Sequence, residues 1–110
     1  MPGKFEVYKD KAGEFRFRLK SSNGQNILAS EGYKAKASCM NGIESVKKNS
    51  QNADRVVKKT TASGKFNFCV VATNGQVVGV SQTYSSESGC RNGMKSVAET
   101  AASATIDDQT

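Results

Sequence analysis

The side chains that could carry chemistry in this sequence are cysteines and basic residues, because histidine is absent. Cys39, Cys69 and Cys90 lie far apart, and none belongs to a Cys-x-x-Cys pair. Zinc needs several such ligands at short spacings, and a disulfide framework usually has an even number of cysteines in an exported chain. The sequence therefore predicts no metal site, no disulfide framework and no cofactor.

Two of the cysteines are expected to be structural. Cys39 and Cys90 fall on predicted apolar helix stripes, where a small thiol packs as a hydrophobic residue. Cys69 falls at an outward position of a predicted strand, so it is the thiol expected to react with a reagent. No neighbouring base would activate it.

Motifs for enzymatic chemistry are missing. The sequence contains no paired carboxylates, no nucleophile beside a base, and neither of the glycine-rich motifs that bind nucleotide phosphates. We therefore expect a protein without catalytic activity.

A row of basic residues is the strongest candidate for a binding site. Residues 15–20 read Phe-Arg-Phe-Arg-Leu-Lys, the period-two pattern of a strand with one buried face, so Arg16, Arg18 and Lys20 project from the other face. Tyr8 is predicted to point the same way. Together they could bind an anionic partner, or nucleic acid with Tyr8 stacking on a base. The simpler interpretation, which the sequence favours, is that these charges keep an open sheet face soluble.

The net charge of +6 is concentrated in the first half of the chain. Residues 1–59 carry 13 Lys and Arg against 6 Asp and Glu, whereas residues 60–110 carry 3 against 4. Any electrostatic function is therefore expected in the first half. A second basic group surrounds the middle of the chain, where lysines near a helix C-terminus are explained by the helix dipole; it comprises Lys47, Lys48, Arg55, Lys58 and Lys59.

The elements that position these residues occur twice. When the chain is shifted by 51 residues, 14 of the 43 positions in 13–55 are identical, including Asn23-Gly24-Gln25 against Asn74-Gly75-Gln76. Identity at this level without a gap indicates a tandem duplication. We expect a first repeat at 1–53 and a second repeat at 54–110, together forming one compact domain.

Each repeat is predicted to contain three antiparallel strands followed by a helix. The predicted strands lie around residues 5–8, 15–19 and 27–29, and again around 56–57, 66–71 and 77–80. The first helix is expected at about 36–49, and the second is capped by Ser85 or Ser86. Asn23-Gly24 predicts a type I′ turn with positive φ at both residues. Gly42 and Gly93, inside the helices, are expected to allow close approach to the sheet.

A unit as small as one repeat buries too little apolar surface to be stable alone. The repeats are therefore expected to share a core in an α+β fold with pseudo-two-fold symmetry. Their strands would form one antiparallel sheet with both helices on one face, giving a monomer that is an internal pseudo-dimer. Neither a membrane span nor a signal peptide is visible, so a cytoplasmic location without membrane contact is expected.

Five short motifs, taken together, are similar to those of a known family. They are Phe5-Glu-Val-Tyr-Lys, Phe15-Arg-Phe-Arg-Leu-Lys, Asn23-Gly24-Gln25, Ser30-Glu-Gly-Tyr33 and Gly42-Ile-Glu-Ser-Val46. With their counterparts in the second repeat they resemble the YegP-like family of bacterial proteins over nearly the whole chain. The resemblance implies β-β-β-α-β repeats with exchanged C-terminal strands, which would make residues 104–107 a strand beside the first repeat. The family has no known function, so no catalytic or binding residue is transferred.

The sequence leaves more than one class of function open. The favoured class is a non-catalytic binding or interaction module that acts on an anionic or protein partner through the basic first repeat. The alternative is a structural or stress-related protein with a protein partner. An enzyme is the third class, and the missing motifs argue against it.

Overall fold

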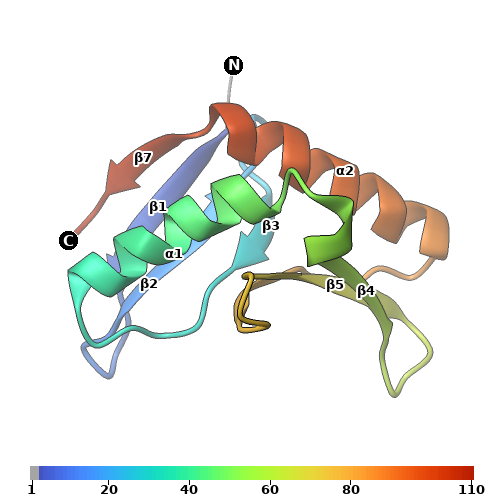
Figure 1. The fold of residues 1–110 in the computed structure, drawn as a ribbon, viewed down its shortest axis with the longest axis horizontal. Helices are drawn as coiled ribbons and strands as arrows, with labels where there is room; N and C mark the ends of the chain where they lie inside the picture. The colour runs from blue at the N-terminus through green and yellow to red at the C-terminus, as the bar shows by residue number, and fades with distance from the viewer. Residues whose placement is uncertain (1–2) are drawn as a thin grey trace.

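The computed structural model describes residues 3–110, except for the side chain of Ala53, and shows a seven-stranded sheet with both helices on one face (Figure 1). The first two residues of the predicted first repeat lie outside this range. The first half contains β1 (Lys4–Lys9), β2 (Phe15–Lys20), β3 (Asn26–Ala29) and α1 (Lys36–Asn49). The second half contains the 3₁₀ turn η1 (Ala53–Arg55), β4 (Val56–Thr60), β5 (Phe66–Val71), β6 (Val77–Val80), α2 (Glu87–Ser103) and β7 (Thr105–Asp108).

The predicted α+β architecture of two tandem repeats is confirmed. The helix α1 has the expected bounds, and α2 begins after Ser86, whose Oγ accepts a hydrogen bond from the backbone N–H of Gly89 at 3.0 Å. The corresponding residue before α1 is Ala35, which has no side chain to cap the helix.

The two repeats join at the middle of the sheet. The strand order is β4-β5-β6-β3-β2-β1-β7, and β3 pairs with β6 antiparallel, with Ala29 opposite Val80. These two residues are 51 positions apart, so they are equivalent in the two repeats. The pseudo-two-fold axis therefore passes between β3 and β6.

The end of the chain differs from the prediction in two respects. The sheet is not wholly antiparallel, because β7 runs parallel to β1, with Ile106 opposite Phe5. α2 carries the chain from β6 across the sheet to the outer edge of β1, where β7 lies parallel to that strand. The exchange of C-terminal strands also occurs in one direction only. In the first repeat the short segment after Asn49 must reach β4, which leaves no chain for a separate strand.

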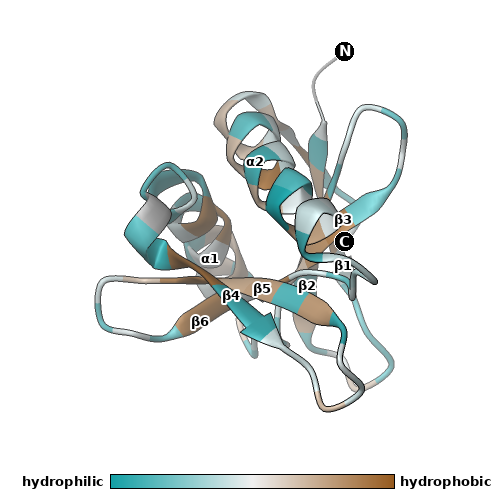
Figure 2. Ribbon diagram, turned by 90° about the vertical axis from the view of Figure 1, so that its right-hand side faces the viewer, coloured by the Kyte–Doolittle hydropathy of each residue, from teal (hydrophilic) through white to brown (hydrophobic). Residues whose placement is uncertain are grey.

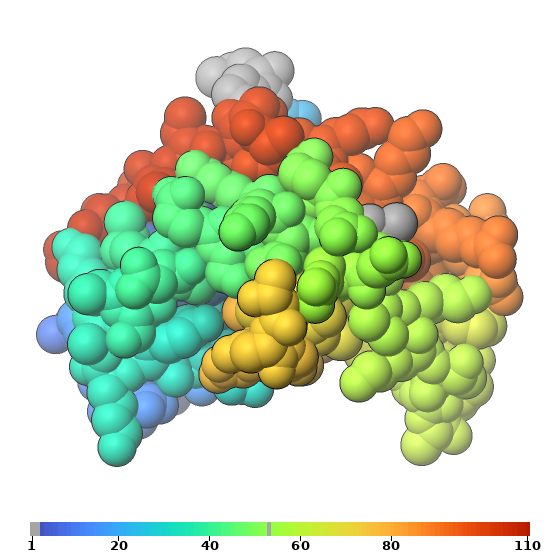
Figure 3. Space-filling model, viewed as in Figure 1, coloured from blue at the N-terminus to red at the C-terminus, as the bar shows by residue number. Residues whose placement is uncertain are grey.

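Each helix packs over strands of both repeats. α1 contacts β2 of its own repeat and β5 and β6 of the other, and α2 contacts β5, β3 and β2. Figure 2 shows the apolar strands β5 and β6 beneath α1, and Figure 3 shows the hairpin that joins them (gold) directly against α1 (green). The core is therefore shared, and its largest fully buried side chains are Phe5, Phe17, Phe68, Leu19, Leu28 and Ile43.

The Asn-Gly turns have a different geometry from the one predicted. Only Gly24 and Gly75 have positive φ, at 84° and 83°, whereas Asn23 has negative φ. The backbone N–H of Gly24 donates to the carbonyl of Ser21 at 2.9 Å, and Ser21 pairs with Gln25. The Oδ1 atom of Asn23 accepts from the N–H of Gln25 at 3.1 Å. This is the three-residue hairpin loop, which needs one left-handed residue rather than two.

The glycine inside α1 allows the predicted close approach. A Cβ atom on Gly42 would lie 2.6 Å from the hydroxyl oxygen of Tyr33 and 3.0 Å from Cε2 of Phe17. Tyr33 stacks on Phe17 with ring centroids 6.4 Å apart, so an added methyl group would have to displace both rings together. The same contact recurs between Gly93 and Tyr84.

We expect the added methyl group of Gly42→Ala to overpack this contact at a cost of about 1–3 kcal/mol. Because alanine gains about 1 kcal/mol over glycine in a helix interior, the free energy of unfolding should fall by up to about 2 kcal/mol. Urea denaturation of the wild type and the variant measures it.

Asn41→Ala, at the neighbouring exposed position, is the matched control and should not destabilise the protein. In a Tyr33→Phe background, which removes the clashing oxygen, Gly42→Ala should cost less. An equal cost in both backgrounds would contradict this explanation.

Candidate functional site

One row of side chains crosses the face of the sheet that the helices leave open. The strand registers place one residue of each strand in this outer row, which reads, from β4 to β7, Val57, Cys69, Val80, Ala29, Arg18, Glu6 and Asp107. Their neighbours along the strands, such as Phe5 and Phe17, point into the core, so these residues point away from the helices. The row is apolar at the second-repeat end and charged at the first-repeat end.

The repeats differ most at this row. Glu6 is equivalent to Val57, and Arg18 is equivalent to Cys69, because each pair is 51 residues apart. An ion pair in the first repeat therefore corresponds to an apolar pair in the second. The two halves of the open face therefore cannot bind the same kind of ligand.

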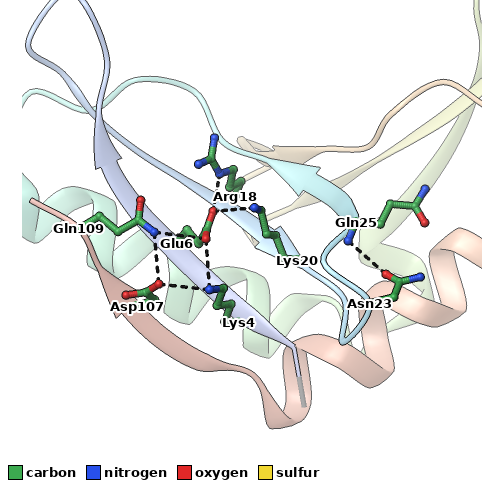
Figure 4. Close-up of polar contacts among 8 residues, drawn as sticks. All are labelled: Lys4, Glu6, Arg18, Lys20, Asn23, Gln25, Asp107 and Gln109. Atoms are coloured by element: carbon green, nitrogen blue, oxygen red, sulfur yellow. Dashed lines mark hydrogen bonds and ion pairs between the residues drawn. The ribbon is translucent and has the colours of Figure 1, made fainter. Parts of the chain in front are cut away.

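Glu6 is the centre of the charged half, and it is only 4% exposed (Figure 4). Its Oε1 accepts from Nε of Arg18 at 2.7 Å and lies 3.3 Å from Nζ of Lys20. Its Oε2 lies 3.4 Å from Nζ of Lys4 and accepts from Nε2 of Gln109 at 3.2 Å. Long side chains from β2, from β1 itself and from the residue after β7 thus cover a carboxylate on an open face.

The surroundings of Glu6 keep it ionised. Burial alone would raise the pKa of Glu6, but hydrogen bonds from Arg18, Lys20 and Lys4 outweigh that effect and lower the pKa to about 2. Glu6 is therefore a permanent counter-charge, and it orients the cations around it.

The predicted binding residues do lie together on this face, although their charges are largely paired. Arg18 lies over the ring of Tyr8, with its guanidinium carbon 4.5 Å from the ring centroid. Nε of Arg16 donates to Asp10 at 2.6 Å, which lowers the pKa of Asp10. Lys20 shares Glu6 with Arg18.

Sequence reasoning missed the carboxylates of this cluster. Glu6 lies directly opposite Arg18 in the β1–β2 register, so a hairpin alignment of the two predicted strands would have revealed the pair. Asp10, in the turn after β1, lies close to Arg16 for the same reason. Asp107, whose Oδ2 is 3.4 Å from Nζ of Lys4, comes from the other end of the chain and carries no local signal.

The charge balance of the face is close to neutral. The cations Lys4, Arg16, Arg18 and Lys20 face the carboxylates Glu6, Asp10 and Asp107, which leaves a surplus of one positive charge. Arg18 donates to Glu6 through Nε alone, and within residues 3–110 its terminal amino groups have no hydrogen-bond partner. Those amino groups are therefore donors that this face can offer to a partner.

Cys69 is not the exposed thiol that the sequence predicted. It is only 4% exposed, because Val57 and Val80 flank it on the two neighbouring strands of the same face. Cys39 and Cys90 are fully buried, as expected, and burial raises the pKa of both thiols.

The second basic group does not form one surface. Nζ of Lys58 is 2.7 Å from Glu87 at the start of α2, and Arg55 donates to the carbonyl of Ala72 at 3.3 Å. Lys47, in the last turn of α1, lies 5.8 Å from the ring centroid of Phe5. These residues serve separate local contacts.

The part of the chain that the structure describes holds no group of three Cys, Asp or Glu side chains placed to bind a metal ion. None of its helices is long and apolar enough to cross a membrane.

Comparison with known proteins places the chain in a family. The model of a domain of unknown function, DUF1508, matches residues 10–56 and again residues 62–108. The chain belongs to this family. The family model matches the chain twice, as a tandem duplication predicts, and the predicted resemblance to YegP-like proteins is confirmed.

Several known proteins match this chain over most of their length. A UPF0339 protein in the ptx operon 5′ region of Stutzerimonas stutzeri is 58% identical over 88% of this chain and 87% of its own. The UPF0339 protein YegP of Escherichia coli K12 is 43% identical over all of both chains.

The solution structure of Escherichia coli yegP, described as a protein of unknown function, matches with a TM-score of 0.95 over 100% of this chain and 95% of that one. A UPF0339 protein of Shewanella oneidensis, 44% identical, matches with a TM-score of 0.92 over 98% and 92%. These homologues are uncharacterised, and none indicates a catalytic function.

We expect Glu6→Gln to remove an acid-sensitive part of the stability. The carboxylate has a pKa of about 2 in the folded protein and an ordinary value of 4.5, so it favours the folded state above pH 4.5. This contribution should be lost as the pH falls from 4.5 to 2. At pH 7 the variant should be less stable by about 2–3 kcal/mol.

Urea unfolding of wild type and Glu6→Gln at several pH values between 7 and 2 measures the difference. Asp108 also has a pKa lowered to about 2, by Lys36 and Thr110, but it is common to both proteins and cancels in the difference. A difference that does not shrink towards pH 2 would show that Glu6 acts by packing rather than by charge.

Proposed function

We propose that the protein is a non-catalytic binding module that holds a protein partner on the open sheet face of its first repeat. Arg16, Arg18, Lys20 and Tyr8 would bind carboxylates of that partner. The observation that carries this proposal is the arrangement of Arg18, which the buried Glu6 and the ring of Tyr8 hold from two sides while its terminal amino groups are free to donate.

Such an arginine is ordered before a partner arrives. Nε is hydrogen-bonded to Glu6, and the guanidinium lies over the ring of Tyr8, so little side-chain freedom is left to lose on binding. The remaining edge of a guanidinium fits a carboxylate in a bidentate manner. Ionised Glu6 is thus a positioning residue for Arg18.

The spacing of the two arginines suits an extended chain. Arg16 and Arg18 project from the same face of β2, about 6–7 Å apart along the strand. Acidic side chains at alternate positions of an extended partner segment have the same spacing. Both guanidinium groups could then be engaged together.

A protein partner suits this face better than nucleic acid. A surplus of one positive charge gives little of the counterion release that drives binding to a phosphate backbone. The apolar half of the outer row lies beside the charged half, and Val57 and Val80 in it are 37% and 40% exposed. A mixture of apolar and arginine-rich surface is typical of protein interfaces. All three cysteines are free, which suits a reducing compartment such as the cytoplasm.

Affinity capture from the source cell with matched variants tests this function. We expect the partner to be retained by the wild type and lost by Arg16→Ala/Arg18→Ala. The control Lys34→Ala/Lys48→Ala removes the same charge from exposed positions elsewhere and should retain it. With the captured protein purified, the arginine variant should bind at least about tenfold more weakly, and the control within about twofold.

Two outcomes would overturn the proposal. Equal retention by all three proteins would show that the open face of the first repeat does not bind the captured partner. Tight binding of single-stranded oligothymidine by the wild type, falling steeply with salt, would assign the face to nucleic acid instead.

A further inference from the structure

The outer edge of β4 is an unfilled copy of a strand-binding site. β1 and β4 are equivalent strands, and β1 carries β7 along its outer edge, with Thr105 opposite Lys4 and Asp108 opposite Val7. The matching edge of β4, at 55–58, has no strand beside it in the described part of the chain, where β4 pairs only with β5. The fold itself thus shows how a strand docks on such an edge.

A count of strands shows that β7 cannot fill both sites. In the described residues each copy has two acceptor edges, on β1 and on β4, but one donor strand, β7. The segment of the first repeat that matches β7 is used as the connection through η1 into β4. In an assembly of identical copies, one acceptor edge per chain therefore stays without a β7 strand, which leaves it open to a strand from another protein.

A cavity lies beside the edge on the side of the helices. It has a volume of about 250 Å³ and is lined by Val56 on β4, by Met94 and Ala98 on α2, and by neighbouring Ser50, Gln51 and Lys95. Val56 is the equivalent of Phe5, and Phe5 lies opposite Ile106 of β7. An incoming strand in the same register would therefore place an aliphatic side chain at this cavity.

On the open face of the sheet, the charges beside this edge favour an acidic residue in the incoming strand. On the strand that docks beside β1, Asp107 follows Ile106 and lies 3.4 Å from Nζ of Lys4. The equivalent of Lys4 is Arg55, so an acidic residue after the aliphatic one would again meet a cation. Lys59, exposed on β4, adds a second. Such lysines also discourage two β4 edges from pairing with each other.

We propose that β4 binds an extended segment of a partner protein as an eighth strand, parallel to β4. The segment carries an aliphatic residue that enters the cavity beside Val56, followed by an acidic residue on the open face. Backbone hydrogen bonds supply the affinity and the cavity supplies the specificity, as in other cases of β-augmentation. This site is separate from Arg16 and Arg18, which lie on β2 in the other half of the sheet.

The probe for this site is an acetylated peptide with the sequence of residues 103–110, which contains the strand that docks on the equivalent edge. Titrated into the ¹⁵N-labelled full chain, it should cause saturable shifts in the amide signals of residues 55–60 and of α2 around Met94. A peptide in which the isoleucine is replaced by serine should bind at least about tenfold more weakly.

Ala98→Phe fills the cavity and should weaken the peptide at least about tenfold. The control Ala102→Phe adds the same side chain at an exposed position of the same helix and should change binding by less than about twofold. Thermal melting of both variants shows that they are folded.

Three results would overturn the inference. Shifts centred on β1, with loss of the β7 signals, would mean that the peptide merely displaces β7. Shifts of β4 signals with protein concentration alone, together with a dimer in sedimentation, would assign the edge to a second copy. An absence of shifts at β4 up to about 5 mM peptide would show that the edge binds no such strand.

Discussion

The rest of the structure depends on the pairing of β3 with β6, which turns two incomplete sheets into one. This junction is narrow, since both strands have four residues, and it lies on the pseudo-two-fold axis. Exact symmetry is impossible there. Leu28 and Gly79 are equivalent positions, and a Cβ atom on Gly79 would lie 2.6 Å from Cδ2 of Leu28. One repeat supplies the leucine and the other leaves the space for it, so the two halves are complementary rather than interchangeable.

The same division explains the open face. Once the core is shared, the outward positions of each repeat are free to diverge without affecting packing. The first repeat acquired a buried carboxylate surrounded by cations, and the second acquired valines and a covered thiol. A buried ion pair contributes less to stability than its geometry suggests, because desolvation of both charges opposes the attraction. What the ion pair does provide is an orientation for Arg18, because Glu6 accepts from its Nε, and an apolar pair would not provide this.

The sequence predicted what local patterns determine. The strands, the bounds of α1, the Ser86 cap and the shared sheet all follow from periodicity, caps and internal identity. It failed where distant segments meet. Glu6 and Arg18 are paired by register, Asp107 reaches Lys4 from the other end of the chain, and valines on neighbouring strands cover Cys69. No single-strand pattern contains these contacts. The prediction of a type I′ turn at Asn23-Gly24 was wrong for a different reason, because Asn-Gly occurs in two kinds of hairpin loop. The side chain of Asn23 favours the three-residue loop, in which only the glycine is left-handed.

The one-way strand exchange is the most consequential of these failures. A duplicated unit that completed itself with its neighbour's last strand would, in a symmetric dimer, fill both edges. Joining the copies in one chain consumes one of those strands, because the connection between α1 and β4 must be short. The duplication therefore strengthens one half of the molecule, since β7 is tethered and always available to β1. It leaves the other half with an open edge on β4, a cavity beside Val56 and flanking cations, which match the strand that β7 supplies to β1. An internal pseudo-dimer built in this way is stabilised by β7 on β1, and it also presents an open strand edge on β4.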